Sequence, residues 1–159
     1  MIRHANSFFI IGFSLLCALL LSVMPLPDGV LIFWPAWTSL VLIYWALEAP
    51  ESVGLGVAFI VGLLEDLLTG ELLGAHASGE VIIIFMTLKF RHRVRFQPVW
   101  QQAFLLALIL LNDRFVHLWV SIFNGLGIPD FAFWLPPFGA MVMWPFLYLI
   151  LDRIRYRNI

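Results

Sequence analysis

Apolar residues fill most of the chain, and prolines, glycines and charged residues interrupt them at intervals. A helix needs about 20 mostly apolar residues to cross a bilayer. The interruptions leave six apolar stretches, which predict an all-α membrane protein with six transmembrane helices. The predicted spans are residues 7–24, 30–47, 52–68, 78–90, 100–123 and 135–151.

Two of these predicted spans are irregular. Pro35 lies in the first turns of span 30–47, where a missing backbone N–H is tolerated best. Span 78–90 is short, because thirteen helical residues cover only about 20 Å. The hydrocarbon core is about 30 Å thick. We therefore expect flanking residues to extend this span, the bilayer to thin around it, or other helices to shield it.

Composition supports a membrane protein. Of the 159 residues, 62% are hydrophobic and 12% are charged, and the mean hydropathy is +0.97. A soluble domain carries about 25% charged residues. We therefore expect residues 1–159 to form a single integral membrane domain. The net charge of −1 gives no indication of a nucleic-acid partner.

The first apolar stretch resembles a signal peptide, because Arg3 and His4 precede the apolar run of residues 7–23. However, Met24-Pro25-Leu26-Pro27 follows it, without the small-x-small pattern of a cleavage site. The first stretch is therefore predicted to be a retained helix.

The cations predict the topology. Eight of the nine lie in three places that share one side of a six-span protein, whereas a five-span protein would divide them. They are Arg3, Lys89, Arg91, Arg93, Arg95, Arg153, Arg155 and Arg157. Loops 25–29, 69–77 and 124–134 contain no Lys or Arg. By the positive-inside rule, both termini are predicted to be cytoplasmic.

Three glycines and an aspartate recur at four-residue intervals in the run GLLEDLLTGELLG: Gly62, Asp66, Gly70 and Gly74. Four helical residues turn about 400°, so Gly62 and Asp66 share one helix face. Gly62 suits close helix packing, and Gly70 is typical of a helix C-terminus. Glu65 points about 100° away from Asp66, which argues against a paired acid and base.

Asp66 lies near a helix C-terminus, where the helix dipole disfavours a negative charge. We therefore expect its carboxylate to accept hydrogen bonds from elsewhere, such as the backbone of loop 69–77. A structural role in capping this loop, a role in binding a partner or ligand, and a catalytic role are all left open.

A second polar group, Asn112-Asp113-Arg114, lies in the middle of span 100–123. Each charge at a bilayer centre costs about 2.5–3.5 kcal/mol. We expect Asp113 or Arg114 to face the bundle or a partner helix, and Arg114 could meet Asp66 or Glu65. His117 lies one turn beyond Asp113. A buried structural pair and a proton or ion path are the alternatives.

The sequence contains no nucleophile motif or phosphate-binding loop. Its four histidines are scattered, so a metal site is not predicted. We expect no catalytic activity and no cofactor.

Several short segments occur in an order and spacing similar to those of the MreD family of rod shape-determining inner-membrane proteins. Besides the Gly62 to Gly74 run, they are Met24-Pro-Leu-Pro-Asp28, Pro35-Ala-Trp37, Leu42-Ile-Tyr-Trp45, Leu88-Lys-Phe90, Trp100-Gln-Gln-Ala103 and Trp144-Pro145. The Asn112-Asp113-Arg114 group matches no family motif.

The resemblance implies a place in the bacterial inner membrane and a non-catalytic role in regulating lateral peptidoglycan synthesis. It implies an MreC-like partner and, directly or indirectly, a RodA-like glycosyltransferase, a class B penicillin-binding protein and the actin-like MreB. It also implies a fold related to the vitamin-binding S-components of energy-coupling-factor transporters.

Three functions follow as hypotheses. A scaffold would act through its glycine faces, aromatic belts and the basic loop 89–95. A small-molecule binder of S-component type would need an enclosed pocket under loop 69–77. A membrane enzyme would need clustered reactive groups. The outer loops are short and are expected to have few polar groups near them, which favours the scaffold.

Overall fold

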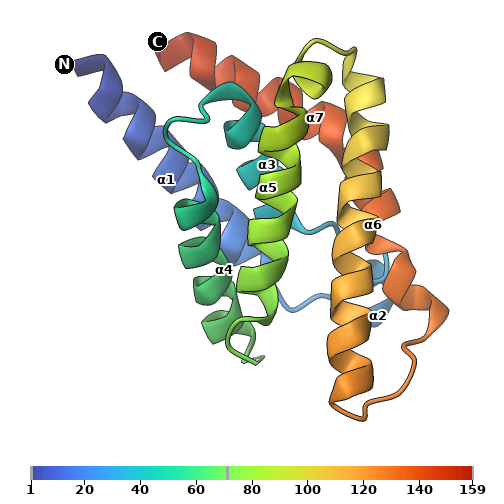
Figure 1. Cartoon of the computed structure of the whole chain (residues 1–159). Coiled ribbons are helices and arrows are strands. Elements are labelled where there is room, and N and C mark those ends of the chain that lie inside the picture. Colours follow the sequence, from blue (N-terminus) through green and yellow to red (C-terminus); the bar gives the residue numbers. More distant parts are fainter. Residues whose placement is uncertain (1, 71, 159) are drawn as a thin grey trace.

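The computed structural model describes residues 2–70 and 72–158, with side chains other than those of residues 2–7, 31 and 158. This part of the chain forms seven α-helices and one 3-10 helix, and it contains no strand, so the all-α prediction is confirmed. The helices are α1 (Ile2–Ser22), α2 (Asp28–Leu31), α3 (Trp37–Glu48), α4 (Leu55–Thr69), α5 (Ala75–Arg95), α6 (Val99–Phe123) and α7 (Pro136–Asn158) (Figure 1). The 3-10 helix, η1 (Phe131–Trp134), precedes α7.

The structure differs from the prediction in span 30–47, which is not one helix. The short α2 ends at Leu31, and α3 begins only at Trp37. Pro35 explains the interruption, because its ring disfavours a helical conformation at Trp34 and clashes with a carbonyl one turn earlier. Pro35 therefore lies between two helices rather than in the first turns of one.

Of the three alternatives for the short span 78–90, the structure confirms the first, extension by flanking residues. Helix α5 has 21 residues, because it includes the polar start at Ala75 and the basic end at Arg95. At 1.5 Å per residue it is about 32 Å long, which matches a hydrocarbon core of about 30 Å. The span therefore needs neither a thinned bilayer nor special shielding.

Helix α3 forms the centre of the bundle. Every residue from Trp37 to Leu47 is buried, and α3 packs against α1, α5 and α7. A helix that is apolar on all sides is expected in such a position. However, its 12 residues cover only about 18 Å, so α3 fills just part of the depth of the longer surrounding helices.

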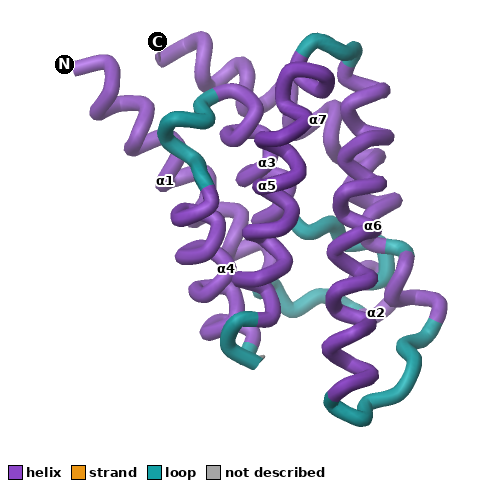
Figure 2. Tube along the Cα trace, in the orientation of Figure 1, coloured by secondary structure: helices purple, strands orange, loops and turns teal. Residues whose placement is uncertain are grey.

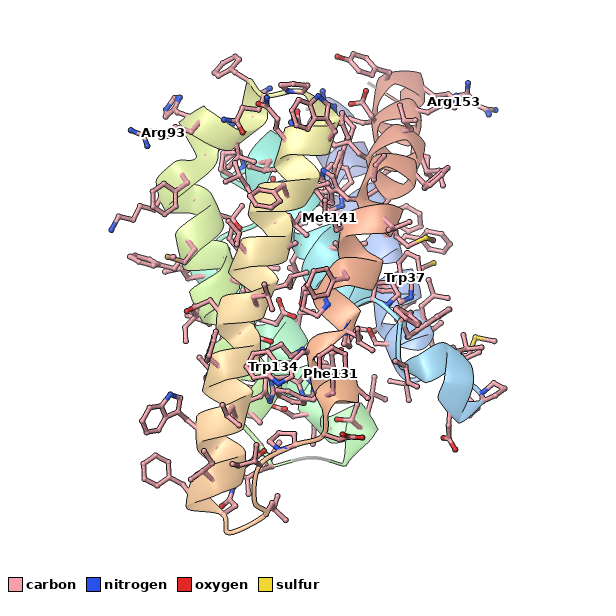
Figure 3. All side chains as sticks on the ribbon, turned by 90° about the vertical axis from the view of Figure 1, so that its right-hand side faces the viewer. Trp37, Arg93, Phe131, Trp134, Met141 and Arg153 are labelled. Atoms are coloured by element: carbon pink, nitrogen blue, oxygen red, sulfur yellow. The ribbon has the colours of Figure 1, made fainter. Side chains whose placement is uncertain are left out.

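The helices run alternately between two ends of the bundle. Both termini and the connections at residues 49–54 and 96–98 lie toward one end, and the connections at 70–74 and 124–130 lie at the other (Figures 1 and 2). Arg93 and Arg153 both lie at the first end, on opposite sides of the bundle in this view, whereas Phe131 and Trp134 lie toward the second (Figure 3). We call the first the basic end and the second the cavity end.

Cations hold the basic end together around Glu48, the last residue of α3. Its side chain is only 4% exposed, and its Oε2 forms salt bridges with Arg95 Nη2 of α5, at 3.3 Å, and with Arg155 Nη1 of α7. Arg91 of α5 also donates from Nε to the Leu47 carbonyl oxygen at 2.8 Å. These contacts join three helices at one point, where the negative end of the α3 dipole also favours cations.

The outer surface of the bundle is apolar. Segments 99–123 and 131–157 are long and apolar enough to cross a membrane, and only 22% of the most apolar window in each is buried within the protein. Residues 8–22 form a shorter apolar helical segment. Exposed large side chains on α1, α4, α6 and α7 include Phe9, Phe13, Ile60, Leu67, Trp119 and Phe146. Soluble proteins rarely expose so much apolar surface, so lipid is the expected surrounding.

Candidate functional site

Asp66 joins the end of α4 to the start of α5. Its buried carboxylate accepts hydrogen bonds from the backbone N–H groups of Gly74 and His76, both at 2.8 Å, and of Ala77 at 3.4 Å. His76 Nδ1 lies 3.0 Å from the same carboxylate. The expected acceptance of hydrogen bonds from loop 69–77 is therefore confirmed. The positive end of the α5 dipole offsets the unfavourable position at the end of α4.

The three glycines in the Asp66 run have two different roles. A Cβ added to Gly62 would lie 2.8 Å from the backbone N of Ala77, so close packing of α4 and α5 requires glycine there. Gly70 and Gly74 have φ angles of 71° and 101°, in the left-handed region that favours glycine, and no close neighbours restrict them. They shape the turn that presents the backbone N–H groups to Asp66.

A cavity of about 760 Å³ lies between the helices and reaches the cavity end, where Leu72 and Leu126 line it. Its position follows from the interrupted second span. Pro35 and Ala36 form part of its wall, because α3 begins too late to fill the centre of the bundle toward the cavity end. Six ionisable side chains line the cavity: Glu65, His76, Glu80, Asp113, Arg114 and His117.

Glu65 and Asp66 point in different directions, as their positions on the helix predict, although His76 bonds Asp66 and lines the cavity with Glu65. Glu65 is 6% exposed and lines the cavity. Asp66 is not among the lining residues and is bonded to the loop instead. Adjacent positions on one helix therefore serve the cavity and the loop respectively.

Asp113 faces the bundle, which confirms that one member of the Asp113-Arg114 pair does so. A Cβ added to Gly79 of α5 would collide with Asp113 Oδ1, and Oδ2 of Asp113 lies 3.7 Å from His117 Nε2. Arg114 lines the cavity with Glu65, and its Cζ lies 5.2 Å from the centre of the Phe133 ring.

Glu80 is not among the site residues predicted from the sequence, yet it lies in the wall of the cavity. It is 4% exposed, and its Oε1 accepts a hydrogen bond from the Ser39 hydroxyl of α3. A signal was present in the sequence, because Glu80 is the one acidic residue within the predicted span 78–90.

The histidines are also less scattered than their spacing indicates. The rings of His76 and His117 lie 5.4 Å apart, and both line the cavity. The expectation of few polar groups near the outer loops is therefore wrong. Among the described residues, no group of three or more His, Cys, Asp or Glu side chains could hold a metal ion.

Three carboxylate oxygens in the cavity wall are buried and have no hydrogen-bond partner within the described part of the chain. They are Glu65 Oε2, Glu80 Oε2 and Asp113 Oδ1. Buried polar atoms of native proteins are nearly always hydrogen-bonded. The cavity wall therefore has hydrogen-bond acceptors without donors among the described residues.

Comparisons with known proteins agree on one family. Residues 3–154 match the family model described as rod shape-determining protein MreD. The rod shape-determining protein MreD of Haemophilus influenzae is 31% identical over 149 residues, which cover 94% of this chain and 88% of that protein. No solved structure matches the chain. Because the family model covers nearly the whole sequence, this chain belongs to the MreD family of rod shape-determining proteins.

Proposed function

We propose that this chain is a scaffold of the cell-elongation machinery that supports lateral peptidoglycan synthesis through contact with an MreC-like protein. Its membership of the MreD family supports a non-catalytic role in determining cell shape. The contact with an MreC-like protein is the further step that the proposal adds.

The observation that carries this proposal is the way Asp66 fixes the α4–α5 connection. Three backbone N–H groups and one imidazole converge on a single buried carboxylate. A surface that is already ordered loses less conformational entropy when a partner binds. The cavity end therefore offers a preformed docking surface, and Asp66, Gly70 and Gly74 define its shape.

The same proposal includes six spans in the bacterial inner membrane, with both termini in the cytoplasm. The clustering of cations at one end supports it, because cytoplasmic loops carry an excess of Lys and Arg. The cavity end then faces the periplasm, where an MreC-like partner could approach it. A RodA-like glycosyltransferase, a class B penicillin-binding protein and MreB would be reached directly or through that partner.

The cavity favours a second candidate function, which is binding of a small molecule as in the S-components of energy-coupling-factor transporters. Its volume of about 760 Å³ lies within the range of about 300–1,000 Å³ for small-molecule sites. The short outer loops in the sequence argue against this candidate, whereas the polar lining of the cavity supports it. A fold related to that of the S-components, which the sequence resemblance implies, is part of this second proposal.

Affinity isolation from the native membrane separates the two candidates. The full chain, tagged at one terminus and solubilised in mild detergent, is expected to recover an MreC-like protein. An untagged strain and an unrelated six-span membrane protein are the controls. Recovery of an ATPase module in place of the MreC-like protein would overturn the scaffold proposal in favour of the second candidate.

A further inference from the structure

The unpaired carboxylate oxygens of the cavity come from three different helices. Glu65 lies on α4, Glu80 on α5 and Asp113 on α6. Glu65 and Glu80 are 6% and 4% exposed, so bulk water reaches neither freely. A carboxylate without a partner at such depth is costly, because burial removes its hydration without replacing it.

The three side chains line one cavity. Asp113 lies against Gly79, the residue before Glu80, and Glu65 lies across the α4–α5 contact in the same cavity wall. The Ser39 hydroxyl occupies one oxygen of Glu80 and leaves the other unpaired. The Ser22 and Thr38 hydroxyls lie close to the Glu65 carboxylate, and His117 lies 3.7 Å from Oδ2 of Asp113. Each of the three side chains still keeps one buried oxygen without a hydrogen bond among the described residues.

The charge of the lining is unbalanced. Among the described residues that line the cavity, three carboxylates stand against one guanidinium, that of Arg114, and the two imidazoles of His76 and His117. The Arg114 guanidinium lies at the Phe133 ring, 5.2 Å from its centre. Trp34 adds a second aromatic side chain to the wall, and aromatic faces attract cations as well.

We propose that this cavity binds the cationic group of an ammonium- or guanidinium-bearing ligand, with the Glu65 and Glu80 carboxylates as its anchors. Ammonium offers three N–H donors and guanidinium five, with no acceptors. Such a group supplies the donors that the unpaired oxygens lack and neutralises the excess negative charge. This site goes beyond the proposed scaffold function, which concerns the outer loop surface.

The cationic group can belong to a free small molecule or to a basic side chain of a docked polypeptide, and separate probes distinguish these sources. Methylguanidinium, with methylurea as its uncharged isostere, tests the first source. A capped pentapeptide with a central Arg, with citrulline as its uncharged isostere, tests the second. Each probe is titrated against the purified full chain in lipid nanodiscs, and ligand-observed NMR measures binding.

We expect a charged probe to bind at least tenfold more tightly than its isostere. The double variant Glu65→Gln/Glu80→Gln should weaken that binding at least tenfold, and Glu51→Gln, which removes an exposed carboxylate at the basic end, should leave it unchanged. If the Arg peptide binds more tightly than methylguanidinium, the ligand is a polypeptide. If methylguanidinium binds more tightly than the peptide, the ligand is a free small molecule. Equal binding of the isosteres, undiminished binding by the double variant, or no binding of either cation would overturn the proposal.

A measurement on the unaltered chain covers the case in which the double variant fails to fold. The uncharged apolar reagent dicyclohexylcarbodiimide, added without an amine, should convert Glu65 and Glu80 to N-acylureas, and the bound cation should slow that reaction at least threefold, as mass spectrometry of the peptides would show. Equal labelling with and without cation would contradict the assignment. Neither experiment contains an MreC-like protein, so failure here leaves the scaffold proposal to its own test.

Discussion

The carboxylate of Asp66 accepts a hydrogen bond from the backbone N–H of His76 at 2.8 Å, although the two residues are ten positions apart. The bond crosses from the last turn of α4 to the first turn of α5. The same carboxylate also accepts hydrogen bonds from the backbone N–H groups of Gly74 and Ala77. One side chain therefore orients the α4–α5 connection at the cavity end.

Asp66→Ala should therefore disturb the connection and weaken partner assembly. It leaves the partly buried N–H groups of Gly74 and His76 without their acceptor, and each should cost less than the roughly 1–3 kcal/mol of a fully buried unsatisfied group. We expect a lower melting temperature, reduced recovery of an MreC-like protein and loss of rod shape in cells that depend on the variant.

Asp28→Ala is the matched control, because Asp28 is an exposed carboxylate at the start of the short α2. It should change morphology and partner recovery much less than Asp66→Ala does. Normal rods and undiminished complex formation with Asp66→Ala would remove Asp66 from the functional residues.

Gly62→Ala should destabilise the α4–α5 pair. The new methyl group would meet the backbone N of Ala77 at 2.8 Å, and backbone atoms shift less easily than a flexible side chain. Overpacking of this kind costs about 1–3 kcal/mol. Thermal unfolding in detergent should show a lower midpoint.

Gly56→Ala provides the comparison, since Gly56 lies in the same helix with nothing within 4 Å of an added Cβ. It should leave the midpoint unchanged or raise it slightly, because alanine favours a helix over glycine. If both variants melt alike, close packing at Gly62 is not what stabilises the pair.

Gly79 and Asp113 should be energetically coupled. Gly79→Ala places a methyl group against Asp113 Oδ1, whereas the added Asp113→Ala substitution removes the obstructing atom. The double variant should therefore be more stable than the sum of the single effects predicts, by about 0.5–3 kcal/mol. A double-mutant cycle of unfolding free energies measures the coupling, and strict additivity would rule out the contact.

The sequence allows the Asp66 connection to be predicted because its parts are local. A charge at a helix end, a following glycine and a short loop lie within about one dozen residues, and helix dipoles act over such distances. The basic end is also predictable, since alternating spans bring Arg93 and Arg153 to the same end by topology alone.

The cavity could not be predicted in the same way, because it depends on packing between distant segments. Glu65, Glu80 and Asp113 meet only once α4, α5 and α6 surround a central helix that begins late. Apolar periodicity extends from residue 30 to 47 without showing that α3 starts at Trp37. The late start depends on the effect of Pro35 on its neighbours, which hydropathy does not report.

Glu48→Gln should loosen the basic end of the bundle. The neutral amide would weaken the contacts with Arg95 and Arg155, which connect α3 to α5 and α7. Hydrogen bonds to charged groups contribute about 1.5–3 kcal/mol to stability. The contribution of Arg95 is smaller, because its side chain is partly exposed and solvent screens the charge. A lower unfolding midpoint is expected.

The neighbouring exposed carboxylate provides the control for that substitution. Glu51→Gln, three positions further along the chain, should have no effect on the midpoint. Equal midpoints for Glu48→Gln and the unaltered chain would show that the arginines find equivalent partners.

Alkaline phosphatase fused after Arg93 should be inactive, because the enzyme requires the oxidising periplasm and Arg93 is assigned to the cytoplasm. A fusion after Gly127, in the connection at the cavity end, should be active. Green fluorescent protein at the same sites should show the opposite pattern, since it does not fluoresce when exported unfolded. High phosphatase activity after Arg93 with none after Gly127 would invert the topology. The cavity would then open to the cytoplasm, and an MreC-like partner would have to reach it from that side.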